Sequence, residues 1–171
     1  MRTRWIALTA LALSVAAGAP RAEERETPDH GSYWAGIGTF DLAHASTSQG
    51  VGLEYRLDSR PLRPRKSRRF TLIPALGLTG TSRNAIFGYV GLRSDFDLGP
   101  RWRLTPGFAA GAYERNGDID LGGPVEFRSS LDVSYALNNG VRVGASLYHI
   151  SNARLYERNP GVNALVFVQT F

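Results

Sequence analysis

Apolar and polar residues alternate along much of the chain, a pattern typical of β-strands with one apolar and one polar face. The alternation is cleanest between residues 125 and 137. There one face carries Val125, Phe127, Leu131, Val133, Tyr135 and Leu137, and the other carries Glu126, Arg128, Ser130, Asp132 and Ser134. The same period runs through 50–57, 70–78 and 101–112, and less regular runs lie near 33–43, near 84–97 and at the end of the chain. We therefore expect about eight strands, since no segment has a sustained helical period.

Short turn sequences separate these strands and indicate antiparallel hairpins. Residues 138–140 (NNG) are a strong hairpin signal, and residues 98–101 (LGPR) form a second turn. Residues 114–124 are long enough for a loop. Pro74 and Pro106 fall inside strands, where each removes a ladder donor and is typical of a bulge.

Such a set of strands fits either a soluble barrel or sandwich, or an outer-membrane barrel. Strands of about 9 to 14 residues favour the membrane, because soluble strands average about 5 or 6. Their polar faces carry charges that suit the interior of a small barrel. The last strand carries Leu165, Phe167 and Phe171 on one face and so resembles the assembly signal of bacterial outer-membrane proteins. The sequence predicts an all-β fold, an eight-stranded antiparallel outer-membrane β-barrel, with Trp34 and Trp102 in its aromatic girdles.

The start of the chain is typical of a secretory signal peptide. A basic beginning is followed by an apolar run from Trp5 to about Ala19 and by small residues. The run is shorter than the roughly 20 residues that a membrane-spanning helix needs, although a retained N-terminal anchor is the alternative. We expect a signal peptide at 1–22 and a single transmembrane β-barrel domain at 23–171.

Charge and cysteine content add two constraints. The net charge of +5 falls to +2 without the arginines of the leader, and the remaining excess lies in residues 60–69 (RPLRPRKSRR). A solvated periplasmic turn is the favoured interpretation of this basic segment, ahead of a site for lipopolysaccharide phosphates. The chain has no cysteine, so an exported fold must be held by packing or by a closed hydrogen-bond network.

Polar residues continue the apolar face of the last two strands. The apolar row of residues 141–147 continues at His149 and Ser151, so both side chains are expected to face lipid. Their Cα atoms should lie about 6.5 to 7 Å apart, within reach of a hydrogen bond between the side chains. Asn163 shares the outward parity of the final strand and should lie beside His149. A nucleophile, a base and an orienting amide are thus expected on adjacent strands.

Residues 148–161 (YHISNARLYERNPG) and the closing strand resemble the signature of the outer-membrane lipid A 3-O-deacylases, an acyloxyacyl-hydrolase-like family. The resemblance implies an eight-stranded barrel with its active site on the outside, near the outer leaflet. It also implies a serine esterase that removes the 3-O-linked 3-hydroxyacyl chain from lipid A of lipopolysaccharide. The resemblance further implies that Ser151 is the nucleophile, that His149 is the general base and that Asn152 contributes to the oxyanion hole.

The third catalytic position departs from the family. The resemblance implies a glutamate two residues after Gly161, where this chain has Asn163. An asparagine can accept a hydrogen bond from the imidazole but supplies no charge. Three interpretations stay open: Asn163 orients the imidazole unaided, Glu157 in the loop serves as the substitute acid, or the barrel has lost activity.

The expected partners are lipid A in the outer leaflet and the membrane itself. Such a barrel can also form a homo-oligomer, and no nucleic-acid partner is expected. The expected location is the bacterial cell outer membrane. No cofactor or metal is predicted, because His30 and His44 lack ligand spacing. The rival function is a noncatalytic small outer-membrane barrel, structural or adhesive, derived from such an enzyme. The charges of the polar faces exclude a soluble barrel that holds a lipid inside.

Overall fold

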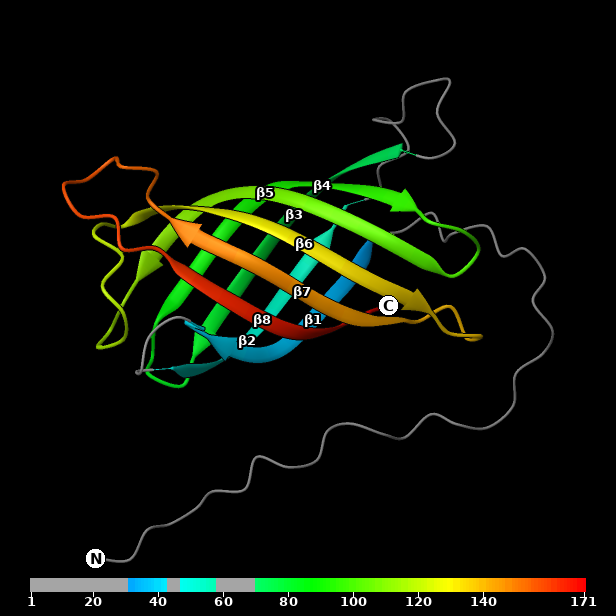
Figure 1. Ribbon diagram of the computed structural model, residues 1–171, viewed down its shortest axis with the longest axis horizontal. Coiled ribbons are helices and arrows are strands. Elements are labelled where there is room, and N and C mark those ends of the chain that lie inside the picture. Colours follow the sequence, from blue (N-terminus) through cyan, green and yellow to red (C-terminus); the bar gives the residue numbers. More distant parts are fainter. Residues whose placement is uncertain (1–30, 43–46, 58–69) are drawn as a thin grey trace, which may run out of the picture.

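The computed structural model describes residues 31–42, 47–57 and 70–171, which form a closed antiparallel barrel in which each strand pairs with the next and the last pairs with the first (Figure 1). The strands are β1 (Ser32–Phe40), β2 (Ser48–Arg56), β3 (Phe70–Thr81), β4 (Ile86–Asp97), β5 (Trp102–Glu114), β6 (Val125–Ala136), β7 (Arg142–Ser151) and β8 (Val162–Thr170). The expected eight-stranded fold is confirmed. The leader, His30, His44 and the basic segment 60–69 lie outside the described residues.

The two ends of the barrel differ. Figure 1 shows the connections 115–124 and 152–161 together at one end, which we call the loop end; the connection 82–85 joins β3 to β4 there. The connections 98–101 and 137–141 and the C-terminus lie at the opposite end, which we call the turn end. The expected turns at 98–101 and 138–140 and the loop after β5 are therefore confirmed.

The two strand prolines do not shift the register. Pro74 pairs with Leu92 and Pro106 pairs with Leu131, each within an unbroken register, so the expected bulges are not found in the described strands. Between β4 and β5 the ladder skips the positions around Pro106 and then resumes in the same register. A missing N–H donor is tolerated here because the flanking pairs hold the two strands together.

The lumen is filled by an ion-pair network centred on Glu54 of β2. Its fully buried carboxylate accepts hydrogen bonds from Arg56 Nε at 2.8 Å, Arg93 Nε at 3.0 Å and Tyr89 Oη at 3.0 Å. Arg128 lies 3.5 Å from the same carboxylate and donates to Tyr89 Oη at 2.6 Å. The charges of this network are thus paired and hydrogen-bonded, as burial requires.

Trp34 belongs to this interior. It is 3 % exposed, and the Arg128 guanidinium lies over its ring at 5.7 Å from the centroid. The expectation of a girdle position for Trp34 is therefore wrong. Its indole has room because Gly36 and Gly52 face it, where a Cβ would come within 2.8 and 3.1 Å of the ring. Trp102, by contrast, is 51 % exposed on the outer wall at the turn end and packs against Tyr135, as a girdle residue would.

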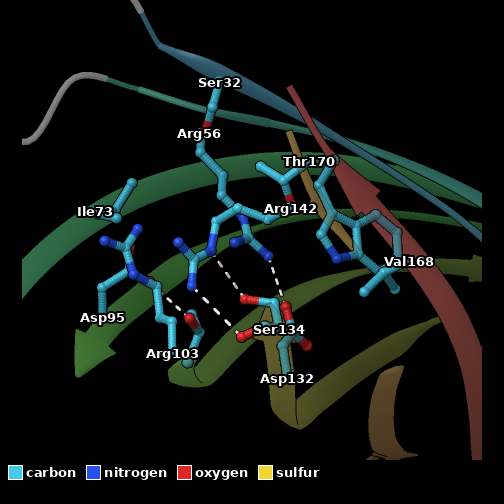
Figure 2. Close-up of a pocket in the computed structure, with 12 residues that line it drawn as sticks. Ser32, Arg56, Ile73, Asp95, Arg103, Asp132, Ser134, Arg142, Val168 and Thr170 are labelled. Atoms are coloured by element: carbon cyan, nitrogen blue, oxygen red, sulfur yellow. Dashed lines mark hydrogen bonds and ion pairs between the residues drawn. The ribbon is translucent and has the colours of Figure 1, made fainter. Parts of the chain in front are cut away.

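A small polar pocket lies inside the lumen at the turn end (Figure 2). Arg56 donates to Asp132 at 2.7 Å, Arg103 donates to Asp95 at 2.8 Å, and Arg142 donates to Ser134 Oγ at 3.1 Å. The cavity between these groups measures about 40 Å³, enough for a few water molecules. Among the described residues, this cavity at the turn end is therefore lined by paired polar groups and has room only for water.

The outer wall is apolar. Large exposed side chains cover it on every strand, among them Leu53, Leu76, Val90, Phe108, Leu147 and Phe167. An exposed apolar surface of this extent marks contact with lipid or another apolar partner. In the described residues no helix is long and apolar enough to cross a membrane.

Candidate active site on the outer wall

A row of directly paired residues crosses four neighbouring strands on the outer wall near the loop end. Phe108 of β5 pairs with Ser129 of β6, Ser129 pairs with His149 of β7, and His149 pairs with Asn163 of β8. All four side chains are exposed, whereas their neighbours Tyr148, Ile150 and Ala164 are buried inside. The expected outward parity of His149 and Asn163 is therefore confirmed.

His149 and Asn163 form a hydrogen bond. His149 Nδ1 lies 3.0 Å from Asn163 Oδ1. Because a carbonyl oxygen can only accept, this bond requires the hydrogen of the imidazole on Nδ1. The lone pair is then on Nε2, which is the nitrogen that takes the proton from the nucleophile in a serine triad.

Ser151 and His149 line one hollow of about 340 Å³ on the outer wall. Its other lining residues are Phe108, Phe127, Ser129 and Ala153. A hollow of this size is at the lower end of the range for small-molecule sites. The imidazole is held against the backbone of Gly161, where a Cβ would come within 2.8 Å of His149 Cε1 and where φ is +65°. Both the conformation and the close approach require glycine at this position of the Asn-Pro-Gly turn.

Asn152 organises the loop that follows Ser151. Its side-chain amide donates to the carbonyl oxygens of Leu121 and Arg158, both at 2.7 Å, and its Oδ1 accepts from the Arg154 N–H at 2.9 Å. Its own N–H donates to Asn159 Oδ1 at 3.0 Å. The residue is fully buried, and the structure does not direct its amide into the hollow. The two residues after it, Ala153 and Arg154, have φ values of +51° and +65°, a strained turn that these bonds hold in place.

The β5–β6 loop braces this turn from the side. A Cβ at Gly122 would collide with the carbonyl of Arg158, and one at Gly123 would collide with the ring of Tyr156, so both glycines permit close contact between the loops. Asp120 accepts from the Gly122 N–H at 3.0 Å and lies 3.2 Å from Arg158 and from Arg115. The Gly122 N–H, aided by the two guanidinium groups, lowers the pKa of the Asp120 carboxyl.

Asp118 ties the same loop to the barrel. Its carboxylate accepts from the Ser48 hydroxyl at 3.0 Å and from the Thr81 hydroxyl, and so links the β5–β6 loop to β2 and β3. The loop end is therefore a connected structure, although sequence reasoning treated residues 114–124 only as a loop. Its signal in the sequence is the paired glycines that follow two aspartates.

The structure brings together some of the expected residues and leaves one apart. His149 and Asn163 are hydrogen-bonded on the outer wall, and Asn152 is buried behind them. Ser151 lines the same hollow as His149, but the expected hydrogen bond between these two side chains is not found among the described residues. Glu157 is exposed in the β7–β8 loop and has no hydrogen bond to His149, whose Nδ1 already faces Asn163. Sequence reasoning missed Ser129, although a polar residue at an outward position of the clean β6 pattern was a visible signal.

Comparisons with solved structures agree on the fold. A crystal structure described as that of the outer membrane enzyme PagL superposes with a TM-score of 0.61 at 20 % identity, covering 82 % of this chain and 98 % of that one. Neisserial surface protein A superposes with a TM-score of 0.51 at 12 % identity, covering 82 % and 94 %. No match was found among curated proteins.

A closed barrel that keeps its charges inside and its apolar residues outside belongs to the class of outer-membrane β-barrels. The sequence model of the family described as "Lipid A 3-O-deacylase (PagL)" matches residues 30–169. The chain therefore belongs to the lipid A 3-O-deacylase family, whose members are outer-membrane ester hydrolases.

Proposed function

We propose that the chain is a serine esterase that removes the 3-O-linked 3-hydroxyacyl chain from lipid A of lipopolysaccharide. Family membership supports the reaction class. The observation that carries the proposal for these residues is the His149–Asn163 hydrogen bond beside a hollow that Ser151 also lines. Such an arrangement supplies a nucleophile, a base and a group that orients the base.

The substrate reaches this site from within the membrane. Outer-membrane barrels have short periplasmic turns and longer external loops, so the loop end faces outward and the hollow lies at the level of the outer leaflet. A neighbouring lipid A can then present its ester laterally, without a soluble cleft. Export depends on residues 1–22, which act as a signal peptide and are removed.

The reaction proceeds by acyl transfer to Ser151. His149 Nε2 takes the hydroxyl proton as Ser151 Oγ attacks the carbonyl carbon of the ester. The tetrahedral intermediate collapses, the bond to the sugar oxygen breaks, and the imidazolium returns the proton to that oxygen. Water, activated by the same imidazole, then releases the fatty acid and regenerates Ser151.

The oxyanion needs hydrogen-bond donors beside Ser151. Asn152 can supply one only if its amide leaves Leu121 O or Arg158 O, which it contacts at 2.7 Å. The backbone N–H of Ala153 is the better placed donor, because Ala153 lines the hollow and its N–H has no hydrogen bond within the described residues. Asn152 then contributes indirectly, by holding the turn that carries this N–H.

The alternative function is a noncatalytic outer-membrane barrel derived from such an enzyme. One observation favours it: Asn163 orients His149 without the negative charge that stabilises an imidazolium. Glu157 would have to displace Asn163 from Nδ1 to supply that charge, and it is exposed in the loop. We therefore assign Asn163, and not Glu157, as the orienting residue.

Mass spectrometry of lipid A tests the proposal. The full chain is expressed in a host with a defined lipopolysaccharide, alongside Ser151→Ala and an empty vector. We expect a lipid A species that lacks one 3-hydroxyacyl chain, and we expect Ser151→Ala to abolish it. Unchanged lipid A with the folded barrel in the outer membrane would favour the noncatalytic alternative.

A further inference from the structure

Ser129 is a polar residue on the lipid-facing wall with no structural task. It lies on β6 directly opposite His149, on the side away from Asn163. The next outward residues of the strand, Leu131 and Val133, are exposed and apolar. Ser129 Oγ forms no hydrogen bond within the described residues, although a hydroxyl in an apolar medium is costly unless it finds a partner.

The same hollow has an apolar side. Phe108 and Phe127 stack there with ring centroids 5.9 Å apart and an interplanar angle of 17°. Phe108 pairs with Ser129, and Phe127 pairs with Ser151. A ligand attached at Ser151 would therefore meet one hydroxyl and two aromatic rings.

We propose that Ser129 hydrogen-bonds the 3-hydroxyl group of the scissile acyl chain and selects 3-hydroxyacyl esters over unsubstituted ones. The proposal rests on the proposed function and assigns a specificity-determining residue to that site. The 3-hydroxyl is three bonds away from the carbonyl carbon that Ser151 attacks. Ser129 and Ser151 are diagonal neighbours, with Cα atoms about 7 to 8 Å apart, a span that the acyl carbons and one hydrogen bond fill.

The aromatic pair then receives the rest of the chain. Beyond its third carbon the acyl chain is a plain alkyl chain, which gains from contact with Phe108 and Phe127 in proportion to the buried apolar area. An unsubstituted chain keeps this contact and leaves the Ser129 hydroxyl without a partner. Discrimination therefore comes from one neutral hydrogen bond, which typically corresponds to about a three- to tenfold preference.

Two matched substrates test the assignment: a 3-hydroxytetradecanoyl ester and the tetradecanoyl ester of the same glucosamine phosphate, in detergent micelles. We expect the wild-type chain to favour the 3-hydroxy ester in kcat/KM by about three- to tenfold. Ser129→Ala should abolish this preference, because kcat/KM for the 3-hydroxy ester falls to that for the unsubstituted ester. Gln49→Ala, which changes an exposed outward residue at the loop end of β2, is the matched control and should keep the preference.

A binding measurement separates this proposal from the proposed function. In the Ser151→Ala background the 3-hydroxy ester should bind more tightly than its partner, and adding Ser129→Ala should equalise the two dissociation constants. If Ser129→Ala keeps the wild-type preference, or lowers kcat/KM equally for both esters, the role of Ser129 is overturned. Turnover that depends on Ser151 would uphold the esterase in either case. A folded wild-type chain without turnover would overturn the esterase, and equal binding of the two esters would overturn the Ser129 assignment.

Discussion

Polar side chains in the Glu54 network of the lumen are hydrogen-bonded to one another, whereas those on the outer wall make few such bonds. Inside, Glu54 meets Arg56, Arg93 and Tyr89, so that nearly every charge of the network has a partner. Outside, Ser129, His149 and Asn163 form a short polar row within an apolar surface, and the single bond between them joins His149 to Asn163.

This difference separates structural from functional polarity. The inner network stabilises the closed barrel, because removing one member leaves another charge buried without a partner. The outer row gives the fold little, because its groups would be better replaced by apolar ones against lipid. Changes in the outer row should therefore alter chemistry without altering stability, and changes in the lumen should do the reverse.

The largest effect is expected in the outer row. Ser151→Ala and His149→Ala should each lower the rate of deacylation by about 10³-fold or more, as loss of a nucleophile or base does in serine hydrolases. The temperature at which the barrel loses its heat-modifiable gel mobility should stay unchanged. A large drop in that temperature would show that the outer row also holds the fold together.

The next effect belongs to the lumen. Glu54→Gln leaves Arg56 and Arg93 without their shared carboxylate and should lower the free energy of unfolding by about 3 kcal/mol. Urea unfolding in lipid vesicles measures this, with the exposed Glu114→Gln as control. The activity of the folded fraction should remain close to that of the wild type, and its selective loss would contradict the division between lumen and wall.

A gain is expected at the orienting position. Asn163→Glu restores a charge that stabilises the imidazolium and an acceptor that cannot flip, so it should raise kcat by about tenfold or more, given that the reverse change in a trypsin-type triad costs about 10⁴. Asn163→Leu should lower kcat, because Nδ1 loses its acceptor. A folded Asn163→Glu variant that is no faster would show that position 163 does not limit the reaction.

The smallest effect connects the two regions. Asn152→Ala removes the bonds to Leu121 O and Arg158 O and should lower kcat by about tenfold through misplacement of the turn after Ser151. Hydrogen exchange of the amides in residues 153–161 should rise at the same time. A loss of kcat without faster exchange would instead favour a direct role for the Asn152 amide at the oxyanion.

Much of the barrel could be predicted because alternation depends only on which face meets lipid. The β6 pattern gave its strand boundaries, and the parity of the last two strands put His149 and Asn163 on the outer wall. Trp34 could not be placed, because the space for its ring is made by Gly36 and by Gly52 on another strand. That space is visible only once the register of β1 against β2 is known.

The loop end was less predictable for a similar reason. The four hydrogen bonds of Asn152 include one to Leu121 in the β5–β6 loop and one to Asn159 in the β7–β8 loop. No local sequence pattern predicts contacts between these two loops. Ser129 is different, because parity alone puts it on the outer face of β6 beside the strand of His149. Ser129 is one polar residue in an otherwise apolar row on β6, and a single exception to the alternation is a weak signal.

Covalent labelling with an alkyl phosphonate ester tests the central claim most directly, since such a reagent phosphonylates an activated serine and the adduct can be mapped by mass spectrometry. For the folded barrel in micelles we expect one adduct, on Ser151, that is slowed strongly by His149→Ala and is absent after heat denaturation. Labelling of Ser129 instead, or an intact Ser151 in a barrel that still deacylates lipid A, would contradict the assignment of the outer-wall site.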